Sequence, residues 1–264
     1  METLAYKFNI LGWLVVSALQ VACVFFLWIG VYNNAEAGAD AVINGFTLKD
    51  MLVYVAFVNV FNFVTFAGNT MYSVVQDIQQ GTIAMSFVKP ISYRVRFMFN
   101  TLGSLFIQMV LLGLPAFTLM YVIFGVLGYI QITSVWLFLL HLVLFFVAQI
   151  LATLLYDCLE YICGVLCFYT TAAWGMDQIK TTIITFLSGT LIPLSFFPSG
   201  FGEILKYSPF AGLSQNPVLI LTMKMDTLSA LSCVGVSLAW LLVLEGVAWL
   251  IFHRASKKVT VQGG

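Results

Sequence analysis

The feature that most restricts the fold is a run of about forty mainly apolar residues, from Val135 to about Ala173. A helix of this length spans roughly 60 Å, about twice the hydrocarbon thickness of a bilayer. One interpretation is a single long, bent helix with its turn at WGMDQIK. The other is a break at YDCLEY, which puts Asp157 and Glu160 at a membrane surface and Asp177 and Lys180 at mid-membrane. Each mid-membrane charge costs about 2.5–3.5 kcal/mol, so energy alone does not decide.

The composition agrees with a chain whose main solvent is lipid. Hydrophobic residues make up 61% of the chain and charged residues 8%, whereas a soluble domain carries about 25% charged residues. This excludes a soluble globular enzyme. The net charge is zero and no basic stripe is present, which excludes electrostatic binding of nucleic acid.

Apolar segments long enough to cross a bilayer recur along the chain, and Pro115 predicts a kink in the third of them. We expect an all-α membrane protein with a single transmembrane domain over residues 1–264. Both interpretations of the long run give six transmembrane helices, with both ends of the chain on one side. With the turn at WGMDQIK, the helices lie at about 11–32, 51–75, 97–124, 135–173, 181–194 and 228–252.

The distribution of cations predicts which side the ends occupy. With the turn at WGMDQIK, eight of the eleven cations fall on the side of the N-terminus and three on the other. Cytoplasmic loops are enriched in lysine and arginine, so both termini are expected in the cytoplasm. The eight are Lys7, Lys89, Arg94, Arg96, Lys180, Arg254, Lys257 and Lys258.

The cytoplasmic segment Gln76–Arg96 contains a short apolar stretch, IAMSFVK. Gly81 ends the second helix, Thr82 is expected to cap a new short helix, and Pro90 disfavours a helical conformation of the residue before it. An isolated helix of this length is unstable in water, so it must pack on something. It either rests on lipid headgroups, with Lys89, Arg94 and Arg96 facing phosphates, or docks into a soluble partner and transmits force.

Two motifs resemble those of one transporter family. DIQQGTIAMSFVKPIS is similar to the segment between the second and third helices of type-2 ABC exporter permeases, in particular the daunorubicin-resistance branch. LSGTLIPLSFFPSGFGEILKYSPFAGLSQNPVLIL, residues 187–221, resembles a second motif of that branch. The acidic pair Asp157 and Glu160 departs from the family pattern, which is mostly apolar or basic there. The resemblance favours the turn at WGMDQIK.

The resemblance implies the permease subunit of an exporter for an amphipathic lipid, drug or peptide, in a bacterial-type cell membrane. The short helix would then be a coupling helix that fits a separate ABC ATPase subunit, and a second permease subunit would complete the pathway. No phosphate-loop motif occurs in this chain, so ATP and magnesium are expected on the partner and no enzymatic activity or cofactor here. The coupling residues that the resemblance implies are Asp77, Gly81, Ile83, Phe87, Lys89 and Pro90.

The glycine- and proline-rich stretch SGTLIPLSFFPSG predicts a re-entrant segment after the fifth helix. Non-helical backbone at membrane depth persists only where protein or water covers it, and the alternative is an ordinary helix end. The family resemblance favours an outer gate formed by Gly189, Pro193, Phe196, Phe197 and Pro198.

Three acids fall in or near the membrane and form candidate pathway residues: Asp157, Glu160 and Glu245. They would line a cation or substrate path, or else form an interfacial pair or contact a second subunit. If they bind ions, the chain would be an ion-coupled secondary transporter that needs no ATPase. His141 is expected to be a hydrogen-bonded packing residue. Cys163 and Cys167 lie one helical turn apart, but no histidine is spaced to join them in a metal site, and we expect both to be small buried residues.

Overall fold

A computed structural model describes residues 7–35, 41–86, 90–130, 134–170, 172–198 and 200–256. Within these ranges the chain forms helices and turns without a strand, apart from an isolated bridge between Ile43 and Phe46. The all-helical expectation is therefore confirmed for the described residues. The helices are α1 (Lys7–Asn33), α2 (Leu48–Thr65), α3 (Thr70–Gln79), α4 (Ile83–Ser86), α5 (Tyr93–Gln108), α6 (Leu114–Val126), α7 (Val135–Leu166), α8 (Ala173–Leu187), α9 (Phe201–Lys206), α10 (Gln215–Leu221) and α11 (Thr227–Ser256).

Four helical segments of the described residues are long and apolar enough to cross a membrane: Leu48–Gln79, Tyr93–Val126, Val135–Leu166 and Thr227–Ser256. The stretch Leu19–Asn33 of α1 is a shorter apolar helix. The chain is thus a multi-pass membrane protein. The count of six spans and the side on which the ends lie remain predictions.

The second span, expected as one helix over 51–75, is interrupted at Phe66–Asn69. Gly68 and Asn69 are weak helix formers, and an apolar pattern does not reveal such a break. The new helix α3 then needs partners for its first amide groups. One of them, the amide of Met71, donates to the Glu160 carboxylate at 3.0 Å, so a buried acid of α7 stabilises the start of α3.

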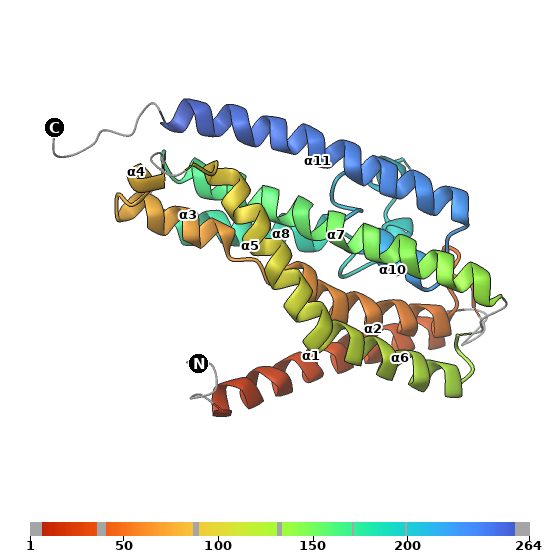
Figure 1. Cartoon of the computed structure of the whole chain (residues 1–264). Helices are drawn as coiled ribbons and strands as arrows, with labels where there is room; N and C mark the ends of the chain where they lie inside the picture. The colour runs from red at the N-terminus through yellow and green to blue at the C-terminus, as the bar shows by residue number, and fades with distance from the viewer. Residues whose placement is uncertain are drawn as a thin grey trace.

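The third span, expected over 97–124, begins earlier at Tyr93 and contains a π-helical turn, Met109–Gly113, between α5 and α6. Pro115 lies directly after this turn and has no amide hydrogen for the carbonyl one turn earlier. The π turn absorbs that missing bond, and the helix changes direction between α5 and α6 (Figure 1).

The long apolar run forms one continuous helix through YDCLEY, but α7 ends at Leu166 rather than near 173. The hydroxyl of Thr170 accepts a hydrogen bond from the amide of Ala172 at 3.2 Å and so helps to form a local turn. WGMDQIK therefore lies in the first turns of α8 and is not itself the turn. As a result α8 occupies Ala173–Leu187, earlier than the expected 181–194.

Helix α7 lies at the centre of the bundle and packs against α11, α3, α10 and α5. The start of α1, helix α4 and the end of α11 lie together at one end, which we call the α4 end (Figure 1). The loops that join α1 to α2 and α6 to α7 lie at the opposite end. The segment from Ser188 to Leu221, with a 3-10 turn at Leu194–Phe196 and helices α9 and α10, lies beside α7 toward this opposite end (Figure 1).

Candidate functional site

A cluster of ionised side chains joins five helices in the half of the bundle nearest α4. We call it the charged cluster, and it comprises Arg94 of α5, Asp157 and Glu160 of α7, Asp177 and Lys180 of α8, and Glu245 of α11, with α3 bound to its acids. Its four acids and two bases come from segments far apart in the sequence. Removing one partner of a buried ion pair is strongly destabilising, because it leaves an uncompensated buried charge.

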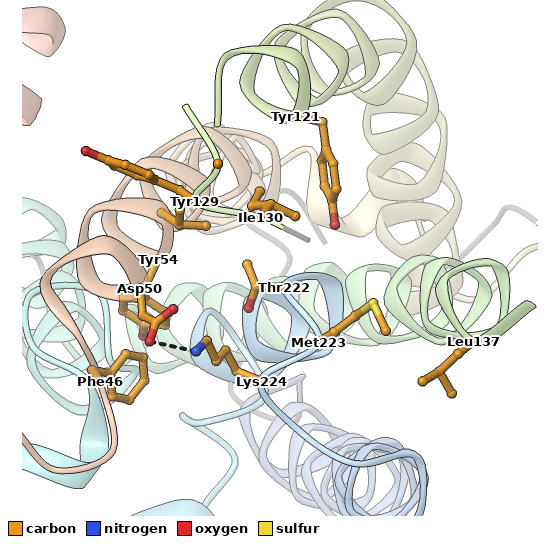
Figure 2. A pocket seen from close by; sticks show the side chains of 12 residues that line it. Phe46, Asp50, Tyr54, Tyr121, Tyr129, Ile130, Leu137, Thr222, Met223 and Lys224 are labelled. Atoms are coloured by element: carbon orange, nitrogen blue, oxygen red, sulfur yellow. Dashed lines mark ion pairs between the residues drawn. The ribbon is translucent and has the colours of Figure 1, made fainter. Parts of the chain in front are cut away.

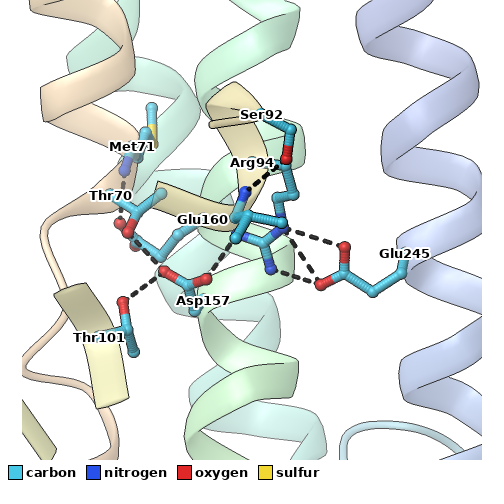
Figure 3. A network of polar contacts seen from close by, with 9 residues as sticks. Thr70, Met71, Ser92, Arg94, Thr101, Asp157, Glu160 and Glu245 are labelled. Carbon is cyan, nitrogen blue, oxygen red and sulfur yellow. Dashed lines mark hydrogen bonds and ion pairs between the residues drawn. The ribbon is translucent and has the colours of Figure 1, made fainter. Parts of the chain in front are cut away.

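Arg94 is the centre of one half of the cluster. Its Nη1 lies 2.5 Å from Oδ2 of Asp157, and its Nη2 lies 2.5 Å from Oε1 of Glu245. Its Nε donates to both oxygens of Glu245, at 3.2 and 3.0 Å, so the guanidinium contacts α7 and α11 at once (Figure 3). The Arg94 side chain is 13% exposed. It therefore does not face lipid phosphates, which was one of the two alternatives for this segment, because the buried Asp157 and the partly buried Glu245 bind it.

Asp157 is satisfied on both of its oxygens. While Oδ2 binds Arg94, Oδ1 accepts hydrogen bonds from the hydroxyls of Thr70 at 2.5 Å and Thr101 at 2.7 Å. Its side chain is 1% exposed. The carboxylate thus ties the first residue of α3 and the middle of α5 to α7 (Figure 3).

Lys180 is the centre of the other half. It forms ion pairs with Glu160 and, at 2.8 Å, with Asp177 on its own helix. Its ammonium also lies 5.4 Å from the ring centre of Tyr156. Because Glu160 also accepts the amide of Met71, this half connects α8 and α7 to α3.

The candidate pathway acids are therefore all paired within this chain. Asp157 forms an ion pair with Arg94, and Glu160 forms one with Lys180. Glu245 shares Arg94 with Asp157. A pathway role for these acids stays a prediction.

The coupling residues lie at the α4 end, directly before Arg94 in the chain. Gly81 has φ +70°, a left-handed conformation that ends the preceding helix as expected. Asp77 accepts hydrogen bonds from Thr82 and Tyr93, both at 2.9 Å, and pairs with Arg96 at 2.7 Å. The Asp77 carboxylate therefore joins the end of α3 to the start of α5, on either side of α4. The Thr82 hydroxyl donates to Asp77, and its expected role as the cap of α4 stays a prediction.

The described part of α4 covers Ile83–Ser86, the first four of the seven residues expected. Ile83 is buried against the bundle, whereas Met85 is 69% exposed. Pro90 is exposed after the helix. Phe87 and Lys89 lie outside the described residues. The structure thus gives α4 an inner anchor and an exposed apolar side chain.

The residues expected to form an outer gate are held by close packing. Gly189 has φ +82°, and its carbonyl accepts the hydroxyl of Tyr54 at 2.7 Å. The Phe196 ring lies 5.2 Å from that of Trp28, and the Phe197 ring lies 5.3 Å from that of Phe186. Pro193 precedes the 3-10 turn, and the carbonyl of Pro198 accepts the amides of Phe201 and Gly202, both at 3.2 Å. A gating role stays a prediction.

A set of uncharged hydrogen bonds, which we call the neutral lock, attaches this segment to α2. Asn62 donates to the hydroxyl of Thr190 at 2.9 Å and accepts from that of Ser214 at 2.6 Å. Gln215 accepts the amide of Leu194 at 2.6 Å. The sequence analysis missed these residues, although a buried asparagine in an apolar helix signals such a partner.

His141 is buried, with its Nδ1 3.0 Å from the carbonyl of Ile220 and its Nε2 3.3 Å from the hydroxyl of Thr227. The expectation of a hydrogen-bonded packing residue is confirmed. It joins α7 to the end of α10 and the start of α11.

Comparisons with known proteins give one result. The family model described as ABC-2 family transporter protein matches residues 18–263. No curated protein and no solved structure matches the chain. The match covers nearly the whole sequence, including the α4 segment, the charged cluster and the neutral lock.

Proposed function

Because the chain belongs to the ABC-2 transporter family, whose members are membrane components of transporters, we propose that it is the permease subunit of an ATP-driven exporter. A separate ATPase would supply the energy, since no phosphate-loop motif occurs in this sequence. The observation that best supports the proposal is the direct connection from the α4 segment to the central helices. Arg94, which follows that segment, binds both α7 and α11.

We place the docking site for the ATPase on α4 and its flanking loops. A short helix with one buried and one exposed apolar side chain is suited to a partner groove, because an apolar anchor surrounded by polar residues is typical of binding hot spots. Met85 is exposed here and Ile83 is buried. Asp77 and Arg96 hold the segment rigid, so a displacement of α4 would displace the segment as a unit.

The charged cluster would then pass that displacement to the bundle. A guanidinium bound to carboxylates on two other helices resists both separation and rotation, because its hydrogen bonds have a fixed planar geometry. Movement of the start of α5 would therefore carry α7 and α11 with it, as in rigid-body transitions of packed helices.

Further features of the proposed exporter follow from the sequence. They are six spans with both ends in the cytoplasm, an outer gate after α8, an amphipathic cargo, a second permease subunit and a location in a bacterial-type cell membrane. ATP and magnesium would bind to the partner, and membership of the daunorubicin-resistance branch is part of the same proposal. The rival, an ion-coupled transporter, would need acids free to bind ions, and Asp157 and Glu160 are instead paired with bases.

The proposal is tested by copurification with the cellular ATPase in mild detergent. We expect Met85→Asp to remove the ATPase, since it puts a charge on the exposed face of α4 without entering the core. Val42→Asp is a matched control, because Val42 is similarly exposed, at 66%, in the loop at the opposite end. Retention of the ATPase by Met85→Asp, or its loss from both variants, would contradict docking at α4.

A further inference from the structure

A cavity of about 450 Å³ lies at the end of the bundle opposite α4. Its walls come from the start of α2, the end of α6 with the loop that follows, the start of α7 and the end of α10 (Figure 2). Most of the lining is apolar or aromatic, with Phe46, Tyr54, Tyr121, Tyr129, Ile130 and Leu137 among the residues. Its volume falls within the range of small-molecule sites, about 300–1,000 Å³.

One ion pair faces this cavity. Lys224 Nζ lies 2.6 Å from Oδ2 of Asp50 (Figure 2). The amide of Thr47 donates to the same oxygen at 3.1 Å. The side chain of Lys224 is 39% exposed, so the ammonium retains donors for a further partner. The cavity therefore combines an apolar interior with an accessible cation.

The backbone positions Lys224 at the cavity. Helix α10 ends in a Schellman motif, in which the amide of Lys224 donates to the carbonyl of Leu219 at 3.0 Å and that of Met223 to Ile220 at 3.2 Å. Met223 occupies the left-handed position, φ 54°, where glycine is usual. Met223 therefore has a strained backbone conformation and also lines the cavity. Strained backbone of this kind is typical of functional segments.

A second lysine lies beside the aromatic wall. Lys49 Nζ is 5.6 Å from the ring centre of Tyr129, and no ion pair joins it to an acid among the described residues. Lys49 is not itself in the lining, so Lys224 supplies the ammonium that faces the cavity and Lys49 a second one beside its wall. An anionic head at Lys224 would accept hydrogen bonds from the donors that Asp50 leaves free.

We infer that this cavity binds an anionic amphiphile, with its carboxylate or phosphate head at Lys224 and Lys49 and its apolar chain against the tyrosines. The cavity lies where α2 and α7 begin and α6 ends, and we place these helix ends near the membrane surface, where lipid headgroups meet the hydrocarbon region. Basic pockets between membrane helices recognise anionic heads in this way. The inference does not depend on the permease assignment, because binding needs no ATPase.

The test uses the full chain in phosphatidylcholine nanodiscs and a photoactivatable long-chain fatty acid. The matched long-chain alcohol and trimethylammonium compound serve as head-group controls, and mass spectrometry locates the labelled peptides. We expect the acid to label the walls within 121–130 and 218–224. Lys224→Met and Lys49→Met should each lower labelling about five-fold, which corresponds to about 1 kcal/mol. Lys206→Met, an exposed lysine on α9, should leave it unchanged.

A further arm adds phosphatidylglycerol to the nanodiscs. Displacement of the fatty acid would identify a membrane lipid as the occupant, and lysine-dependent labelling without displacement would identify a free amphiphile; both support the site. Equal labelling by the acid, the alcohol and the ammonium compound would overturn the inference. The inference would also be overturned if Lys224→Met and Lys49→Met were labelled as strongly as the parent while their melting temperatures matched that of the parent.

Discussion

The two ends of the bundle are held by different interactions. Near α4, six ionised side chains bind α5, α7, α8 and α11 to one another, and two of the acids bind α3. Toward the opposite end, the segment after α8 is attached to α2 by the neutral lock and to α1 by the contact of Phe196 with Trp28. Ion pairs therefore join whole helices at one end, whereas neutral hydrogen bonds and close packing hold a single segment at the other.

This difference follows from the range of each interaction. Attraction between ionised groups in a low-dielectric interior falls slowly with distance, so ion pairs keep holding helices that shift slightly. Neutral hydrogen bonds weaken with small changes in distance and angle, and a gap of about 0.5–1 Å forfeits about a quarter to a half of a packing contact. The α4 end is therefore suited to transmitting movement between helices. The neutral lock is suited to holding the segment after α8 in one position until all of its hydrogen bonds break together.

The largest expected effect comes from removing the central cation. Arg94→Met leaves Asp157 and Glu245 without their base, and an uncompensated buried charge costs about 3–5 kcal/mol. Arg96→Met is the matched control, because Arg96 is 40% exposed and its loss should cost at most about 1 kcal/mol. Unfolding in detergent, followed by temperature and by denaturant, measures both.

A rescue variant separates charge from packing. Arg94→Met combined with Asp157→Asn and Glu245→Gln removes all three charges, and replacing a whole buried ion-pair group is often close to neutral. We expect stability near that of the parent. If the single and triple variants are equally unstable, or if Arg94→Met resembles Arg96→Met, charge does not hold this end.

A smaller effect is expected from a methyl group added at Gly189, which lies beside Gln215 of the neutral lock. A Cβ at Gly189 would lie 2.9 Å from Cβ and Oε1 of Gln215 and from the Tyr54 hydroxyl, at a backbone of φ +82°. Gly189→Ala should cost about 3 kcal/mol through overpacking and strain.

Gly45→Ala isolates the strain, since φ there is +86° and, chain neighbours aside, no atom lies within 4 Å of the added carbon. We expect about 1 kcal/mol for this control, from the backbone conformation alone. The same denaturation measurement compares the two. Equal losses would show that close packing around Gly189 does not hold the segment.

Hydrophobicity alone predicted the helical, multi-pass character of the fold, because long apolar segments leave few alternatives in lipid. It did not predict the break at Gly68 and Asn69 or the end of α7 at Leu166, since both depend on local hydrogen bonds within apolar sequence. The motif resemblance predicted the family, which the match over residues 18–263 shows.

The candidate site was predicted only in part. Asp157, Glu160 and Glu245 stood out as acids in apolar helices, but their partners Arg94 and Lys180 were assigned to the membrane surface because the cations were counted by loop. Whether an acid pairs with a base depends on which helices are neighbours and on how deep each residue lies in the bundle. The spacing of residues along the sequence gives neither. Matching acids with bases at similar depths would have suggested the cluster.

The claim that Arg94 joins the α4 segment to α7 and α11 is tested most directly by a distance measurement. Spin labels at positions 85 and 250, both exposed, report the separation of α4 and α11 by pulsed electron paramagnetic resonance. We expect a narrow distance distribution in the parent. In the triple variant Arg94→Met, Asp157→Asn, Glu245→Gln it should broaden at unchanged stability. An equally narrow distribution in that variant would contradict the account.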